Sequence, residues 1–338
     1  MVCDVVVGGF YGDEGKGKII AYIIKKDNIN LAARGGVGPN AGHTFVINGS
    51  THKVRMLPSA AFNSTTKLAI GSGVLVSPQV LMNEISTFNT NGRTFIDEQC
   101  GIITSEHIHK DSSDNHFKKK IGTTGTGTGP ANADRALRSI KLAREIPELK
   151  KYVTNVSELI HSSLDKNESI LLEGTQGTFL SLYHGGYPYV TSKDVTASSI
   201  CADVGVGPKS IDDVLVVFKS FVTRVGSGPL ENELDRSDSE KRGWIEYGSV
   251  TGRERRSSPF NFKLAKKAIQ LNGGTQLALT KLDVLFPEIK GITEYSKLSK
   301  NAKNFVEDIE SDLGLKVVLI GTGPELDAVI DKRSTFNN

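Results

Sequence analysis

The fold is set by a stretch near the start of the chain, Val5-Val6-Val7-Gly8-Gly9-Phe10-Tyr11-Gly12-Asp13-Glu14-Gly15-Lys16-Gly17-Lys18. The three valines predict a short buried strand, and the apolar residues between Ile19 and Ile24 recur with the spacing of a helix. Glycines between a strand and a helix let backbone N–H groups converge on an anion at the helix N-terminus, where the helix dipole also favours negative charge. The stretch therefore predicts a strand, a phosphate-binding loop and a helix.

The loop departs in two places from the common phosphate-binding pattern G-x-x-x-x-G-K-[ST]. Phe10 stands where the first glycine belongs, and Gly17 follows Lys16, so no hydroxyl is offered to Mg²⁺. Asp13 lies inside the loop and is a hard oxygen ligand suited to Mg²⁺, but a carboxylate there could equally act as a base. The spacing alone also fits a plain tight turn.

The composition is that of an ordinary soluble protein, with 338 residues of which 38% are hydrophobic and 23% charged. The net charge is only +3, so no global field predicts binding to nucleic acid or to a membrane surface, and no window reaches the ~18 apolar residues of a membrane span. Cys3, Cys100 and Cys201 are too widely spaced for a disulfide framework or a zinc site, which favours a reducing cytoplasm.

Two further glycine loops are candidates for ligand binding, over residues 35–43 and 122–130. The second cannot form a regular helix or strand and is expected to wrap a ligand. The pair Asn48-Gly49 between apolar segments predicts a hairpin. Strands alternate with helices without a linker-like break. We therefore predict a single α/β domain over residues 1–338, with a P-loop NTPase-like, mostly parallel central sheet flanked by helices and with small hairpin and loop excursions.

Basic and amide side chains supply more candidates. A basic helix is predicted over residues 132–144, with Arg135 and Arg138 on one face. A buried strand over residues 169–172 ends shortly before Gln176. Because strands in open parallel sheets deliver ligand contacts from their carboxyl ends, Gln176 is well placed to touch a ligand.

The last third of the chain holds two short motifs. Thr251-Gly252-Arg253-Glu254-Arg255-Arg256 puts an arginine cluster on a predicted loop, either as a solvated basic turn or as a clamp for carboxylates and phosphates. Thr280-Lys281-Leu282-Asp283 resembles the Asn-Lys-x-Asp element of GTP-binding proteins, in which the aspartate accepts hydrogen bonds from guanine and the lysine stem covers the ring. The tail predicts a strand over residues 316–320, a turn over 321–324 and a helix.

One family resemblance joins these motifs. The string from Tyr11 to Lys18, followed by Asn40-Ala41-Gly42-His43-Thr44, resembles the opening of the adenylosuccinate synthetase family, and the other motifs follow in the family's order as far as Asp331. The length resembles the compact form of archaeal members. The resemblance implies a GTP-dependent ligase that joins L-aspartate to IMP through 6-phosphoryl-IMP, giving adenylosuccinate, GDP and phosphate. This is the first committed step of AMP synthesis from IMP.

The resemblance also implies roles for individual residues. Asp13 would take the N1 proton of IMP and, with the Gly42 carbonyl, hold Mg²⁺, while His43 would stabilise the phosphoryl group in flight. The catalytic residues would be Asp13, Lys16, His43 and Gln176. GTP would be bound by Gly12, Asp13, Glu14, Gly15, Lys16, Gly17, Lys18, Gly42, His43, Thr44, Arg255, Lys281, Leu282, Asp283, Gly321, Thr322 and Gly323. IMP would be bound by Asp13, Lys16, Asn40, Ala41, Gly42, His43, Thr124, Gln176, Thr191, Arg253 and, from the second subunit of a homodimer, Arg138. L-Aspartate would be bound by Val250, Thr251, Gly252, Arg253 and Arg255.

The chain departs from common members of the family at a few positions. Phe10 and Tyr11 usually read Gln-Trp, Thr126 is often arginine, and Gly321 is often serine, so one hydroxyl contact near guanine is lost. A first alternative is a 2-aminoadenylosuccinate synthetase acting on dGMP, but bacteriophage relatives of that kind carry serine where this chain has Asp13, which favours IMP. A second alternative, a regulatory GTPase, leaves the arginine cluster and the loop over 122–130 unexplained.

Overall fold

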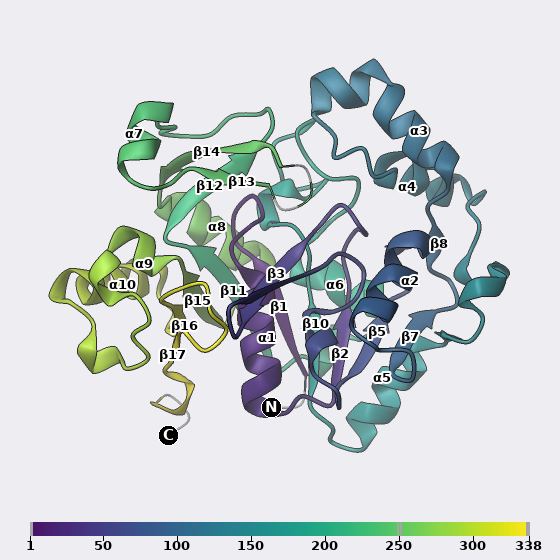
Figure 1. The fold of residues 1–338 in the computed structure, drawn as a ribbon, viewed down its shortest axis with the longest axis horizontal. Coiled ribbons are helices and arrows are strands. Elements are labelled where there is room, and N and C mark those ends of the chain that lie inside the picture. Colours follow the sequence, from purple (N-terminus) through teal and green to yellow (C-terminus); the bar gives the residue numbers. More distant parts are fainter. Residues whose placement is uncertain (1–2, 249, 251, 336–338) are drawn as a thin grey trace.

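The protein is organised around a ten-stranded sheet in the computed structural model, which describes residues 3–248, 250 and 252–335 (Figure 1). The strand order is β17-β16-β15-β11-β1-β10-β2-β5-β7-β9, and every neighbouring pair is parallel except β16 and β17. The strands are β1 (Cys3–Gly8), β2 (Leu31–Arg34), β5 (Lys67–Ile70), β7 (Thr94–Asp97), β9 (Val153–Thr154), β10 (Ile170–Glu173), β11 (Asp213–Lys219), β15 (Gln276–Thr280), β16 (Val317–Gly321) and β17 (Val329–Asp331). The predicted fold class is confirmed.

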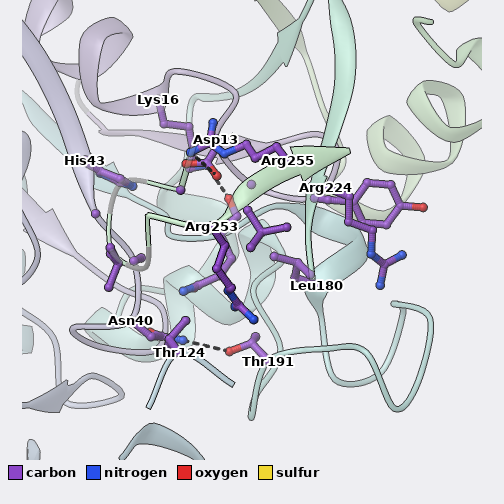
Figure 2. Close-up of a pocket in the computed structure, with 18 of the residues that line it drawn as sticks. Asp13, Lys16, Asn40, His43, Thr124, Leu180, Thr191, Arg224, Arg253 and Arg255 are labelled. Carbon is purple, nitrogen blue, oxygen red and sulfur yellow. Dashed lines mark hydrogen bonds and ion pairs between the residues drawn. The ribbon is translucent and has the colours of Figure 1, made fainter. Parts of the chain in front are cut away.

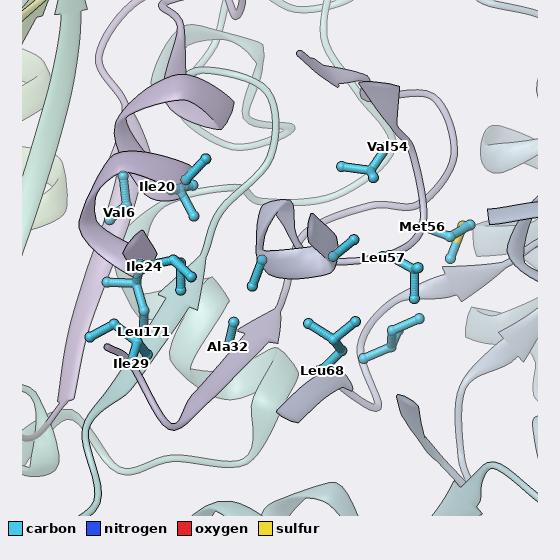
Figure 3. Packing of buried hydrophobic residues seen from close by; sticks show 14 of the residues in the cluster. Val6, Ile20, Ile24, Ile29, Ala32, Val54, Met56, Leu57, Leu68 and Leu171 are labelled. Carbon is cyan, nitrogen blue, oxygen red and sulfur yellow. The ribbon is translucent and has the colours of Figure 1, made fainter. Parts of the chain in front are cut away.

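Helices cover both faces of this sheet. One face packs against α1 (Lys16–Asp27) and α2 (Pro78–Thr87), and the other against α5 (Val156–Asp165), α6 (Ala197–Val204), α8 (Phe262–Asn272) and α10 (Lys300–Leu313). Successive side chains of a strand point to opposite faces, so Val6 joins the α1 side while Val5 and Val7 join the other (Figure 3). Each fully buried isoleucine of α1, such as Ile20, contributes about 1.5–3 kcal/mol to this packing.

Smaller elements rise beyond the sheet on the side away from both termini (Figure 1). The hairpin of β3 (His43–Ile47) and β4 (Ser50–Val54) turns at Asn48 and Gly49, whose φ angles of 51° and 76° are those predicted for this pair. A three-stranded antiparallel sheet joins β12 (Phe221–Val225), β13 (Glu246–Tyr247) and β14 (Glu254–Pro259), with α7 (Arg236–Lys241) beside it. The remaining elements are β6 (Leu75–Val76), β8 (Gly101–Ile102), α3 (Ser105–Ser113), a π-helical turn (His116–Ile121), α4 (Thr128–Leu137), α9 (Leu282–Leu285) and several short 3₁₀ turns.

Three predictions of local structure were wrong. The arginine cluster does not lie on a loop: Arg255 and Arg256 belong to β14, because pairing with β12 overrides the low strand propensity of a charged segment. The basic helix begins earlier, at Thr128, and ends at Leu137, where Arg138 adopts a left-handed φ of 64° and the Ser139 N–H returns to the Asp134 carbonyl. After the turn over 321–324 the tail forms strand β17 rather than an α-helix, because its β-branched residues pair with β16, and only a 3₁₀ turn at Arg333–Thr335 follows.

Candidate active site

A cleft of about 820 Å³ opens at the carboxyl ends of the central strands, between the three-stranded sheet and the α3–α4 region. Figure 2 shows two groups of side chains in it, with Asp13, Lys16 and Arg255 at one end and Asn40, Thr124 and Thr191 at the other. The predicted site residues that line it are Gly12, Asp13, Gly15, Lys16, Gly17, Lys18, Asn40, Ala41, Gly42, His43, Thr44, Thr124, Gln176, Thr191, Val250, Arg253, Arg255, Lys281, Gly321 and Gly323. Residues predicted from separate parts of the sequence thus share one cavity.

The glycine loop between β1 and α1 is held by its own glutamate. Glu14 Oε1 accepts hydrogen bonds from the Phe10 N–H (3.0 Å) and the Gly12 N–H (2.8 Å), and Oε2 pairs with Lys16 Nζ at 2.8 Å. Glu14 is buried and does not line the cleft, so its place is beneath the loop, although we predicted it as a GTP ligand. Lys16 Nζ also donates to the Gln176 carbonyl, which ties the loop to the segment that follows β10.

His43 is held by a buried network that the sequence did not reveal. Its Nδ1 lies 2.5 Å from Glu173 Oε1, and the same oxygen accepts from Arg34 Nη1 at 2.9 Å and from Ser59 Oγ at 3.0 Å. Glu173 and Arg34 are register partners at the ends of the neighbouring strands β10 and β2. The signal in the sequence was a charged residue ending each of two apolar strands, but their pairing depends on strand order.

The ring of His43 is set up to act through Nε2. Burial lowers the pKa of His43 to about 4, against the opposing pull of the Glu173 carboxylate. Glu173 accepts a hydrogen bond from Nδ1, so the other ring nitrogen, Nε2, is the one left to meet a ligand. Nε2 has no hydrogen-bond partner among the described residues.

Asp13 forms an ion pair with an arginine that also lines the cleft. Arg255 Nη2 lies 2.7 Å from Asp13 Oδ2, and Arg255 Nη1 lies 2.9 Å from Glu246 Oε2. Burial raises the pKa of the Asp13 carboxyl above its usual range, and the Arg255 charge offsets part of that rise. Burial also acts to raise the pKa of Glu246, but the neighbouring cations, Lys219 foremost, lower it to about 2. A carboxylate with a raised pKa in a cleft is a candidate base.

The predicted guanine-binding segments meet beside the glycine loop. Lys18 Nζ donates to the Gly323 and Ala328 carbonyls, and burial lowers the pKa of Lys18 to about 8. The Asp283 carboxylate is close enough to oppose that shift. Thr280 Oγ1 donates to the Glu14 carbonyl at 2.6 Å, which joins the end of β15 to the glycine loop. Three predicted residues here, Leu282, Asp283 and Thr322, do not line the cleft.

The end of the cleft that holds Asn40, Thr124 and Thr191 is built from polar loops. Asn40 Nδ2 donates to Thr191 Oγ1 at 3.3 Å, and Asn40 Oδ1 has no hydrogen-bond partner among the described residues. The loop over residues 122–127 is fastened by the buried Asp111, which accepts from Thr123 Oγ1 at 2.7 Å and from the Gly127 N–H at 2.8 Å. This fastening presents Thr124 to the cleft. Asp111 was not among the predicted residues.

A family model described as adenylosuccinate synthetase matches residues 5–146 and 140–290 of the chain. This chain belongs to the adenylosuccinate synthetase family. It is 53% identical to the adenylosuccinate synthetase of Methanocaldococcus jannaschii, over 99% of this chain and 98% of the relative. It is 51% identical to that of Methanococcus vannielii, over 99% of this chain and all of the relative. The predicted resemblance, including its compact archaeal form, is confirmed.

Two solved structures carry the same fold. The fully ligated adenylosuccinate synthetase from Plasmodium falciparum superposes with a TM-score of 0.89 at 25% identity, covering 98% of this chain and 99% of that one. The succinoaminodeoxyadenylate synthetase of cyanophage S-2L, bound to dGMP and dATP, gives a TM-score of 0.81 at 26% identity, covering 98% and 95%. The sequence is thus much closer to the archaeal adenylosuccinate synthetases than to the phage enzyme.

The residues of this adenylosuccinate synthetase family member fit a Mg²⁺ ion carried mainly by a nucleotide. Among the described residues no three His, Cys, Asp or Glu side chains form a group that could hold a metal ion by themselves. Mg²⁺ commonly binds proteins through one or two carboxylates while substrate phosphates and water complete its shell. Asp13 offers such a carboxylate beside the glycine loop, and Gly42 lines the same cleft.

Two further predicted residues of this family member stand apart from the cleft. Arg138 is exposed at the end of α4 and does not line its own chain's cleft. Gly252 is exposed and does not line it either. Thr251 lies outside the described residues. Across the described part of the chain, no helix has the length and apolar character needed to cross a bilayer.

Proposed function

We propose that Asp13 and His43 carry out the chemistry of this family in the cleft described above. The chain is a GTP-dependent ligase that joins L-aspartate to IMP and yields adenylosuccinate, GDP and phosphate. One observation carries the residue assignment. Asp13 and His43 come from two different glycine loops and line one cleft, and His43 has its Nδ1 occupied by Glu173 while Nε2 has no partner.

The reaction needs both groups because the 6-oxo group of a purine leaves poorly. Taking the N1 proton of IMP makes O6 nucleophilic, which is a task for a positioned carboxylate, and the raised pKa of Asp13 suits it to the task. O6 then attacks the γ-phosphorus of GTP, and the bond to the β,γ-bridging oxygen breaks to release GDP. The amine of aspartate displaces phosphate from C6 of the resulting 6-phosphoryl-IMP.

Charge on the phosphoryl group must be offset as it moves. The negative charge favours a protonated His43, whose Nε2–H can donate to a phosphoryl oxygen while Glu173 accepts at Nδ1. Lys16 and Arg255 supply further positive charge at the same end of the cleft (Figure 2). Asp13 and the Gly42 carbonyl would hold Mg²⁺, which offsets charge on the β- and γ-phosphates when bound.

The substrates divide the remaining cleft. We assign the GTP phosphates to the glycine loop and Thr44, and guanine to the cleft lining at Lys281 and Gly321, with Asp283 two residues beyond Lys281. IMP then lies along Asn40, Ala41, Thr124, Gln176 and Thr191, and L-aspartate lies against Val250, Arg253 and Arg255.

Assembly as a homodimer is part of the proposal. Arg138 is exposed and outside its own cleft, which is compatible with a contact to IMP bound in a second subunit. We also propose that residues 1–338 form one domain, since strands from both ends of the chain, β1 and β16, belong to the same sheet. A cytoplasmic location is supported by three buried, unpaired cysteines.

Isotope transfer tests this mechanism. IMP labelled with ¹⁸O at position 6 should deliver that oxygen to inorganic phosphate, because the aspartate amine supplies the new bond at C6. Label found in water would exclude the phosphorylated intermediate. The same assay with dGMP in place of IMP tests the alternative substrate, and GTP consumption that needs neither IMP nor aspartate would indicate a plain GTPase.

A further inference from the structure

Glu246 on β13 sits at the centre of three cations that come from three different elements. Its Oε2 lies 2.8 Å from Lys219 Nζ and 2.9 Å from Arg255 Nη1, and its Oε1 lies 3.3 Å from Lys281 Nζ. Lys219 ends β11, Arg255 belongs to β14 and Lys281 directly follows β15. None of the substrate roles assigned above uses Glu246, although its side chain lines the cleft.

Arg255 is shared between two carboxylates. One terminal nitrogen, Nη1, is bound to Glu246, while the other, Nη2, is bound to Asp13. The two roles proposed for Asp13, taking the N1 proton of IMP and binding Mg²⁺, need both of its carboxylate oxygens, and Arg255 Nη2 occupies Oδ2. Arg255 must therefore exchange Asp13 for another anion, and a phosphate oxygen of GTP is the anion that arrives there.

Glu246 is itself firmly anchored. Lys219 is buried, does not line the cleft, and donates to Thr223 Oγ1 at 2.5 Å as well as to Glu246. A buried ammonium without its carboxylate is costly, so Lys219 keeps Glu246 in place. The anchor leaves Glu246 with fixed acceptors for Arg255 and Lys281 at the surface of the cleft.

We propose that Glu246 is a positioning residue that holds Arg255 through Nη1 while Nη2 moves from Asp13 to the GTP phosphates, and that it ties this movement to Lys281 in the guanine subsite. This inference rests on the proposed function. Glu246 touches no substrate in this role. It makes recognition of the base and release of the catalytic carboxylate depend on one another.

Glu246→Gln tests the role with little change of shape. The amide loses the negative charge that three cations share, so Arg255 stays with Asp13 and Lys281 loses its fixed position. We expect the KM for GTP to rise about tenfold and kcat to fall at least about tenfold, while the KM for IMP stays within about twofold. Glu246→Asp keeps the charge with a shorter reach and should recover part of both losses.

Glu233→Gln is the matched control. Glu233 pairs with Arg256, the next residue on β14, at 2.6 Å and is partly exposed. The same substitution there should leave all three KM values and kcat within about twofold. If Glu246→Gln behaves like this control, the proposal is wrong.

A double-mutant cycle tests the tie between the two subsites. With Glu246 present, Lys281→Met and Arg255→Lys should together reduce kcat/KM for GTP by less than the product of their separate effects. In the Glu246→Gln background the two effects should multiply. Equal coupling in both backgrounds would show that Glu246 does not connect the two residues.

A double variant that removes one charge of each sign separates the positioning role from a purely structural one. If Glu246→Gln alone fails to fold, Glu246→Gln combined with Lys219→Met removes the buried ammonium together with its partner carboxylate and should fold. That double variant should still show the raised KM for GTP, and wild-type kinetics from it would overturn the proposal. Failure of the proposed function would look different, because wild-type protein would then form no adenylosuccinate from GTP, IMP and aspartate.

Discussion

Glu173→Gln should both destabilise the protein and slow the reaction. The Glu173 carboxylate is fully buried and accepts from Arg34 Nη1, His43 Nδ1, Ser59 Oγ and the Ser59 N–H. An amide of the same shape replaces one oxygen by a donor, so at least one of these donors meets another donor. Arg34, also fully buried, loses its counterion.

The magnitude follows from these contacts. Leaving one partner of a buried ion pair uncompensated costs about 3–5 kcal/mol. Unfolding entropy of about 2.1 cal/mol/K per residue gives roughly 0.7 kcal/mol/K for a chain of 338 residues. The melting temperature should therefore fall by about 4–7 °C, and the displaced His43 should lower kcat by about 10²-fold.

Thermal unfolding and steady-state kinetics measure the two effects separately. Glu168→Gln is the control, since Glu168 pairs with Lys67 at 3.3 Å near the surface just before β10, and such pairs contribute about 0–1 kcal/mol. His43→Asn should lower kcat without the loss of Arg34's counterion, and so with a smaller change in melting temperature. A Glu173→Gln protein that melts within about 1 °C of wild type would refute the reasoning, because Glu173 would then compensate no buried charge.

Three other predictions concern the base, the subunits and pH. Asp283→Asn should abolish activity with GTP and let XTP restore part of it, because an amide presents a donor where the carboxylate accepted; normal use of GTP would show that Asp283 does not read the base. Mixing an Arg138→Leu protein with an Asp13→Asn protein should regenerate activity if Arg138 acts across subunits, and no recovery despite demonstrated exchange would place Arg138 in its own chain. Burial lowers the pKa of Lys18 from its ordinary value of 10.5 to about 8, so between these pH values the unfolded chain binds more protons and the contribution of Lys18 to stability rises with pH. The free energy of unfolding of wild type minus that of Lys18→Met, from denaturant titrations, should therefore increase from pH 8 to pH 10.5, and a constant difference would contradict the shift.

Local patterns were sufficient for much of the fold. The valines of β1, the glycine loop and the Asn48-Gly49 hairpin are determined by neighbours in the sequence, and the structure has all three. Alternation of strands and helices also gave the parallel sheet.

Features that depend on partners far along the chain were not predictable in this way. Glu173 meets Arg34, 139 residues away, only because β10 and β2 are adjacent in the sheet. β14 forms by pairing with β12, although its own residues favour a loop. Glu246 is an ordinary surface glutamate in the sequence, and its importance appears only when the ends of β11 and β15 are brought beside it.

The glycine loop carries one more consequence. Glu14 binds Phe10, Gly12 and Lys16, and Thr280 of β15 donates a hydrogen bond to the Glu14 carbonyl. The loop is therefore held in place without a ligand. Fixing a residue's backbone costs about 1–2 kcal/mol of conformational entropy, so ordering the seven residues from 9 to 15 would cost roughly 7–14 kcal/mol. Folding has already met this cost before a nucleotide arrives. A nucleotide therefore docks without the entropic cost of ordering this loop.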